Sequence, residues 1–173
     1  MVKNKIEVGD KAPLFKIESY NAGMIDLGDL ISRKQKIVLI FSRYFGCPIC
    51  QLDFSILLEA VPEIKEKGAK LLYITQSGEE AAQEFIKKYN VDFPVIPSSK
   101  DESYAEYGLG LMTSGAVMQI RSKLKEVNKL GITHGPYEGW EKQSAGQFVI
   151  GEDGTILHER KGWLLLPEIF AVL

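Results

Sequence analysis

The chain has 173 residues, which is enough for one domain with a core that needs no disulfide framework. Its 21 basic and 23 acidic side chains form no basic cluster and no acidic tail, so the charge pattern gives no reason to expect nucleic acid or an anionic membrane as a partner. The N-terminus lacks the apolar stretch of a signal peptide, and no run of 18 apolar residues is present, so we expect no membrane span and a location in the cytoplasm. Small molecules and other proteins remain as partners.

The first half of the chain predicts a β-hairpin and then parallel strands joined by a helix. Residues 8–27 favour a short hairpin around the turn at Asn21 to Gly23. The uninterrupted apolar run at 36–42 is typical of a central strand that is covered on both faces. A helix with apolar residues spaced by three and four follows and ends at Gly68, and the next strand is expected at 70–75.

The second half predicts a helix that opens with a capping box at Ser77 and Glu80, then a short strand, a helical turn, an insertion over 111–140, a β-hairpin and a closing helix. Their expected ranges are 77–89, 93–96, 101–107, 116–127 for the helix of the insertion, 147–150 with 155–158, and 167–173. This order is that of an α/β, thioredoxin-like fold: a central mixed sheet flanked by helices, with an N-terminal hairpin extension and a helical insertion before the last hairpin. We expect a single domain over 1–173.

The only two cysteines, Cys47 and Cys50, lie between the central strand and the helix that follows it. The first turn of a helix presents unpaired N–H groups and the positive end of the helix dipole, which stabilise a thiolate on Cys47. Pro48 suits the first helical position. Cys50 lies about one turn further on, close enough to form a disulfide with Cys47, and is expected to stay a thiol. The pattern predicts a redox-active pair.

Two other interpretations of the pair remain open. A CxxC can be half of a zinc site, but zinc needs four ligands, and the only histidines, His134 and His158, lack the spacing of a zinc finger. The pair can also be an inert structural one. The strand-to-helix context favours redox use over both, so we expect no metal and no organic cofactor.

Four segments resemble the AhpC/TSA-type antioxidant domain, specifically its peroxiredoxin-like 2 branch: Val8 to Phe15, Phe41 to Cys50, Phe93 to Val95 and Gly146 to Ile150. The resemblance extends over nearly the whole chain. It implies a thioredoxin fold and a thiol-dependent peroxidase or disulfide reductase, recycled by thioredoxin or a similar dithiol reductant. The sequence leaves open whether two copies form a homodimer.

Around the two cysteines, the chain departs from the sequence patterns of both peroxiredoxins and thioredoxins. Typical peroxiredoxins carry a proline and a threonine where this chain has Ile40 and Tyr44, and an arginine where it has Ala145. Thioredoxins carry a proline before the corresponding later strand, whereas residues 144–146 contain none. The usual group that activates a peroxide is therefore incomplete.

Arg43 and Tyr44 are the nearby substitutes. A guanidinium four residues before Cys47 can hold a thiolate or a peroxide oxygen; the alternative is a solvated charge at the end of a strand. The Tyr44 hydroxyl can donate to a peroxide, or its ring can simply pack. We therefore predict a thiol oxidoreductase in which Cys47 attacks a peroxide or a disulfide, Cys50 resolves the product, and Arg43 and Tyr44 assist.

The insertion supports a rival interpretation, a non-catalytic thioredoxin-like binding module or redox sensor that grips a partner through 111–140. An apolar stripe on its helix favours this, although such stripes are more often core: Val117, Ile120, Leu124 and Val127. His134 is either a base on a lid or a surface histidine. Tyr137 and Trp140 either line a groove or anchor the loop.

Overall fold

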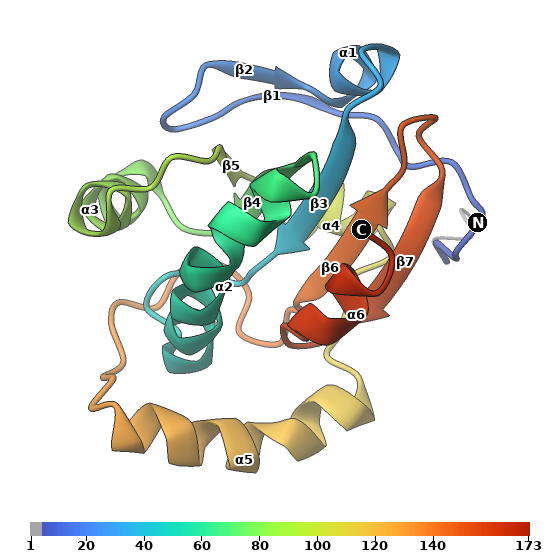
Figure 1. Ribbon diagram of the computed structural model, residues 1–173. Coiled ribbons are helices and arrows are strands. Elements are labelled where there is room, and N and C mark those ends of the chain that lie inside the picture. Colours follow the sequence, from blue (N-terminus) through green and yellow to red (C-terminus); the bar gives the residue numbers. More distant parts are fainter. Residues whose placement is uncertain (1–4) are drawn as a thin grey trace.

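The computed structural model describes residues 5–173 and has a five-stranded sheet with helices on both faces (Figure 1). The strands are β1 (Lys16–Glu18), β2 (Met24–Asp26), β3 (Lys36–Phe41), β4 (Ala69–Thr75), β5 (Val95–Pro97), β6 (Gly146–Ile150) and β7 (Ile156–Lys161). The helices are α1 (Leu27–Ser32), α2 (Pro48–Glu66), α3 (Glu79–Tyr89), α4 (Ser103–Glu106), α5 (Ser114–Lys129) and α6 (Leu166–Phe170). Across residues 5–173, no helix combines the length and apolar character that crossing a membrane requires.

Strand β3 lies at the centre of the sheet, whose order is β5-β4-β3-β6-β7. It pairs in parallel with β4 and antiparallel with β6. Its side chains alternate between two apolar cores, with Ile37, Leu39 and Phe41 in one. Val38 and Ile40 belong to the other. Because both faces are covered, every position of this strand except the first is apolar, and the predicted central strand is confirmed.

Helices cover the two faces unequally (Figure 1). The face with α2 and α6 holds the larger aromatic cluster, in which the Phe54 ring lies 5.2 Å from Tyr73 and 5.3 Å from Phe45. The opposite face is closed by α1 and α4, with Tyr104 packed edge-on against Phe41. Phe54 therefore fixes α2 on the sheet about one helical turn after Cys50, and this packing holds the helix N-terminus in place.

The N-terminal hairpin is confirmed: β1 and β2 pair antiparallel as a separate two-stranded sheet. The sequence expectation was wrong at Leu27, which begins α1 instead of extending the hairpin. The reason is local, because the Asp26 carboxylate accepts the backbone N–H of Asp29 and caps a helix there. The short fifth strand also begins later than predicted, at Val95.

The predicted capping box at Ser77 and Glu80 does not form. The N-cap of α3 is Gly78, and the Ser77 hydroxyl instead accepts the backbone N–H of Phe45 at 2.8 Å. The serine thereby holds the loop that leads to Cys47. A tertiary contact has replaced the local one that the spacing indicated.

Helix α5 of the insertion lies outside the layers of the sheet and contacts α2 (Figure 1). Val127 of the predicted apolar stripe is buried, but Val117 and Leu124 are 53% and 39% exposed. The stripe is therefore not core along its whole length. Lys123 forms an ion pair with Asp53 of α2, which joins the insertion to the helix that carries the cysteines.

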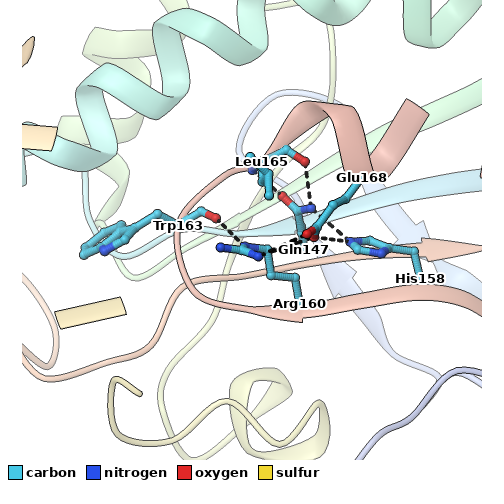
Figure 2. Close-up of polar contacts among 6 residues, drawn as sticks. All are labelled: Gln147, His158, Arg160, Trp163, Leu165 and Glu168. Carbon is cyan, nitrogen blue, oxygen red and sulfur yellow. Dashed lines mark hydrogen bonds and ion pairs between the residues drawn. The ribbon is translucent and has the colours of Figure 1, made fainter. Parts of the chain in front are cut away.

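A polar cluster joins the last hairpin to the C-terminal segment (Figure 2). The Gln147 carbonyl accepts the Leu165 N–H, so its amide nitrogen faces the Leu165 carbonyl and Nε2 of His158, both at 3.0 Å. His158 Nε2 must then accept, which requires a neutral ring. Burial lowers the pKa of His158 and favours that form, whereas the Glu168 carboxylate nearby opposes it.

Candidate active site

Cys47 is the N-cap residue of α2, and Pro48 begins the helix, as the sequence predicts. The loop from Phe41 turns here, with the Cys47 N–H donating to the Tyr44 carbonyl at 3.1 Å. Cys47 itself has extended backbone angles, φ −70° and ψ 120°. Its sulfur therefore lies beside the free N–H groups of the first helical turn, where negative charge is stabilised.

The two thiols have opposite electrostatic environments. A hydrogen bond from Cys50, the nearby Arg43 guanidinium and the N–H groups of Cys50 and Ile49 lower the pKa of Cys47 to about 7, although burial opposes them. Burial and the neighbouring Cys47 sulfur raise the pKa of Cys50 well above its ordinary value. Both cysteines are free thiols. The pair thus offers one ionisable sulfur and one protonated donor.

The Arg43 side chain is buried next to the Cys47 sulfur. Only 6% of the residue is exposed, and its Nη1 lies 3.6 Å from the Cys47 sulfur. Its Nη2 donates to the backbone carbonyl of Glu141 and lies 3.3 Å from the Glu141 carboxylate. The alternative of a solvated charge at a strand end is therefore wrong, because the guanidinium is held on both sides within the site.

Tyr44 is packed and hydrogen-bonded at the same time. Its ring is buried, and its hydroxyl lies 3.3 Å from Nε2 of His134. His134 Nδ1 lies 2.6 Å from the Gly135 carbonyl, which can only accept, so Nδ1 carries the proton. Burial, and after it the Glu141 carboxylate, raise the pKa of Tyr44, which keeps the hydroxyl protonated at neutral pH.

Residues 132–141, which comprise the end of the insertion and Glu141, are here called the covering segment and lie over the loop that precedes Cys47. The Gly135 N–H donates to the Gly46 carbonyl at 2.9 Å. A Cβ atom on Gly46 would lie 2.1 Å from the Pro136 carbonyl oxygen, so only glycine permits this approach. Cys47 itself is only 3% exposed, in an apolar cluster that includes Ala116, Trp163 and, from the covering segment, Ile132.

Tyr137 and Trp140, the two large aromatic residues of the covering segment, lie in different surroundings. Tyr137 stacks on His134 with ring centroids 4.0 Å apart and is 71% exposed. Trp140 is half-buried, lies beside the Lys100 ammonium and helps to line a separate surface hollow. His134 and Tyr137 are thus brought to the site, whereas Trp140 is not.

Asp53 and Glu141 are two site residues that the sequence reasoning missed. Asp53 follows Cys50 by three residues on α2, and its carboxylate accepts the Leu164 N–H at 3.0 Å. Burial raises the pKa of Asp53, although the Lys123 ammonium opposes the shift. A cavity of about 20 Å³ is lined by Cys50 and Asp53, about the volume that one water molecule needs. An acidic residue on an apolar helix face was the available signal for Asp53, whereas nothing local marked Glu141.

The geometry offers little to a metal ion. Residues 5–173 hold no cluster of three or more His, Cys, Asp or Glu side chains arranged as ligands. His134 and His158 lie in different places, one in the covering segment and one on β7. The buried pair with its adjacent guanidinium is instead suited to nucleophilic attack by sulfur.

The known proteins that this chain resembles are named as thiol-dependent redox proteins. The putative peroxiredoxin bcp of Coxiella burnetii is 28% identical over 152 residues, which cover 87% of this chain and 85% of that protein. The thiol-disulfide oxidoreductase ResA of Bacillus cereus is 25% identical over 127 residues, which cover 72% of this chain and 70% of that protein.

Solved structures show the same fold. A putative thiol:disulfide interchange protein DsbE from Chlorobium tepidum superposes with a TM-score of 0.67 at 19% identity, covering 97% of this chain and 99% of that one. Peroxidoxin BcpB from Mycobacterium tuberculosis gives a TM-score of 0.66 at 16% identity, covering 91% and 86%. The predicted thioredoxin-like α/β fold is confirmed. Because residues 8–159 match the AhpC/TSA family, the chain belongs to that family of thiol-dependent redox enzymes.

Proposed function

We propose that Cys47 is the attacking thiolate of this thiol oxidoreductase and that Cys50 resolves the product. One observation carries the proposal: the Cys47 sulfur lies at the N-terminus of α2 with the Arg43 Nη1 at 3.6 Å, while burial and the Cys47 sulfur raise the pKa of Cys50. This arrangement supports ionisation of the first sulfur and keeps the second protonated.

The proposed cycle balances with either class of oxidant. With a peroxide, the Cys47 sulfur takes one oxygen and becomes a sulfenic acid, and the other oxygen leaves as hydroxide or alkoxide. With a disulfide, Cys47 forms a mixed disulfide and releases one thiolate. In both cases Cys50 then attacks Cys47, expels water or the second thiol, and leaves the Cys47–Cys50 disulfide.

An external dithiol, thioredoxin or a similar protein, returns two electrons and two protons. We propose the cytoplasm as the compartment, because its reducing poise suits a pair that must be reset after every turnover. Association into a homodimer stays a prediction, which a measurement of molar mass in solution checks.

Alkylation as a function of pH tests the assignment. Iodoacetamide is expected to modify Cys47 first, with half-maximal rate near pH 7, the pKa of its thiol. Peptide mapping by mass spectrometry identifies the site. Faster modification of Cys50, or no reaction by either thiol until about pH 8.5, the value of a free cysteine, would remove Cys47 from the role.

The binding module or redox sensor is a second candidate, favoured by the exposure of Val117, Met118 and Leu124 on α5. A sensor is oxidised once and then awaits a signal, whereas an enzyme turns over repeatedly with a dithiol donor. Steady-state turnover with hydrogen peroxide or a disulfide, absent in Cys47→Ser, distinguishes the two.

A further inference from the structure

The Arg43 guanidinium has an anionic partner at each of its two terminal nitrogens. Its Nη1 lies 3.6 Å from the Cys47 sulfur, and its Nη2 lies 3.3 Å from the Glu141 carboxylate. The Arg43 side chain is buried, so solvent screens these contacts less than it would at the surface. The thiolate of Cys47 and the carboxylate of Glu141 therefore share one buried positive charge.

The backbone of Glu141 holds Arg43 independently of the Glu141 side chain. The Glu141 backbone carbonyl accepts a hydrogen bond from Nη2. This part of the chain is fixed two residues later, where the Gln143 N–H donates to the Trp140 carbonyl at 3.0 Å. The Gln143 side chain is itself buried and donates to the Leu109 carbonyl at 2.7 Å. The carbonyl that places the guanidinium therefore remains when the Glu141 side chain is changed.

The Glu141 carboxylate contributes charge rather than placement. Its side chain is 50% exposed, and it contacts the nitrogen that already has a backbone acceptor. Its charge nevertheless acts within the site, because after burial it is the next cause that raises the pKa of Tyr44. A negative charge beside the guanidinium lowers the positive potential at the sulfur and so disfavours a second anion there.

The other ionisable groups around the two sulfurs are held in contacts of their own. They come from α2, α5, the loop before α2 and the covering segment: Cys50, Asp53, Lys123, Tyr44 and His134. Asp53 is paired with Lys123. Tyr44 lies against His134 and stays protonated, as does Cys50. Glu141 is thus the carboxylate that opposes Arg43 beside the reactive sulfur.

A counter-charge on Arg43 has a chemical use. As the pKa of a thiol falls, more of it is ionised, but each thiolate becomes a weaker nucleophile. The best attacking thiol therefore has a pKa near the surrounding pH. The Cys50 thiol, the N–H groups of the first helical turn and Arg43 all favour the thiolate of Cys47. A carboxylate on the guanidinium limits how far they act together.

Resting on the proposed function, we propose that Glu141 is a positioning residue that sets how strongly Arg43 stabilises the Cys47 thiolate. The carboxylate and the thiolate compete for the same guanidinium through different nitrogens. The Glu141 backbone keeps Arg43 in place, and the Glu141 side chain reduces its effective charge at the sulfur. Glu141 acts on Cys47 through Arg43 and takes no part in bond formation.

Removing the charge of Glu141 tests the proposal. Glu141→Gln keeps the shape of the side chain and an oxygen acceptor, and Glu141→Ala removes the carboxylate altogether while the backbone carbonyl remains. Glu152→Gln is the matched control, because it makes the same change of net charge at an exposed position in the turn between β6 and β7. That turn lies at the far end of the sheet, since Ile150 pairs with Ile37 and Gly146 with Phe41.

Two quantities are measured as a function of pH: the ultraviolet absorbance of the thiolate, and the rate at which iodoacetamide modifies Cys47, with the site identified by peptide mapping. In both Glu141 variants the midpoint of ionisation should fall by about half a pH unit, since a half-exposed carboxylate acts more weakly than a fully buried neighbour. The limiting rate at high pH should fall by about 1.5–2-fold, because the more acidic thiolate is less nucleophilic. Glu152→Gln should match the wild type.

The outcomes separate this inference from the proposed function. An unchanged midpoint, or an equal shift in Glu152→Gln, would show that the carboxylate does not act on Cys47 through Arg43. A midpoint that rises toward that of a free cysteine, with a faster limiting rate, would mean that the carboxylate only keeps Arg43 in place. Each of these results overturns the inference and leaves Cys47 as the attacking thiolate. If iodoacetamide modifies Cys50 before Cys47 in the wild type, the proposed function fails and this inference fails with it.

Discussion

The N-terminal half of α2 and the covering segment meet at Cys47 but are stabilised in different ways. The helix is anchored by a buried aromatic cluster that includes Phe45, Phe54 and Tyr73. The covering segment has mostly exposed side chains and is held by hydrogen bonds to loops and helix ends. The comparison indicates that apolar packing places the Cys47 sulfur, whereas a few polar contacts hold the segment that lies over its loop.

Arg43 links the two regions. It comes from the loop after β3 and touches the Cys47 sulfur with one nitrogen, while another nitrogen is held by Glu141 at the end of the covering segment. A single side chain thus contacts both the Cys47 sulfur and the covering segment.

The largest expected effect comes from the cysteines. Cys47→Ser should abolish turnover, because no other thiolate can attack from the helix N-terminus. Cys50→Ser should complete one attack and stall, with a sulfenic acid or a mixed disulfide trapped on Cys47. Mass spectrometry of the intact protein detects the adduct. Sustained turnover by Cys50→Ser with a dithiol donor would contradict its resolving role.

Phe54→Ala and Tyr137→Ala compare the two regions directly. Removing the buried Phe54 ring should lower the free energy of unfolding by about 3–5 kcal/mol, because it leaves a cavity under α2. Removing the exposed Tyr137 ring should change it by no more than about 0.5 kcal/mol. Urea denaturation of both variants measures the difference. Similar losses would show that the cover is part of the cooperative core.

Arg43→Met tests the residue that contacts both the Cys47 sulfur and the covering segment. If the guanidinium stabilises charge on the departing oxygen, peroxide oxidation of Cys47 should slow by about 10²–10³, far more than its alkylation. Stopped-flow oxidation and iodoacetamide kinetics, each corrected for thiolate fraction, give the two rates. An equal fall in both would mean that Arg43 acts only on the pKa of Cys47, and no fall would exclude both roles.

The pKa of Cys47 makes stability depend on pH in a defined direction. The folded protein lowers this pKa from 9.0 to about 7. The thiolate therefore contributes to the free energy of unfolding as pH rises above 7, and this contribution is lost as pH falls back through 7. The gain approaches about 2 kcal/mol near the unfolded pKa. Urea denaturation of the reduced wild type and of Cys47→Ser between pH 6 and 8.5 checks this. Parallel pH profiles would contradict the lowered pKa.

The smallest expected effect concerns His158, far from the cover. Burial lowers its pKa in the folded protein, so its contribution to stability is present above its unfolded value of 6.5 and is lost as pH falls below it. His158→Gln should flatten the loss of stability between pH 7 and 5, as followed by thermal unfolding. An unchanged slope would mean that the Gln147 contact tolerates a charged ring.

Much of the frame of the site follows from the sequence alone, because it depends on local patterns. The apolar run of β3 predicts a strand covered on both faces, and Pro48 after Cys47 predicts the start of a helix. From these two patterns, the position of the redox pair and the lower pKa of its first thiol follow by the electrostatics of a helix N-terminus. The thioredoxin-like order of elements was predictable for the same reason.

What surrounds the pair was decided only by tertiary structure. Glu141 lies 98 positions from Arg43 along the chain, and Gly135 meets Gly46 through backbone atoms alone, so no local pattern marks either contact. Ser77 fits the sequence pattern of a helix cap, but its hydroxyl accepts the distant backbone N–H of Phe45 instead. A hydrogen bond between remote segments depends on how the whole chain packs, whereas periodicity and capping record only neighbouring residues. The sequence therefore indicated the candidate nucleophile, and the fold determined what lies around it.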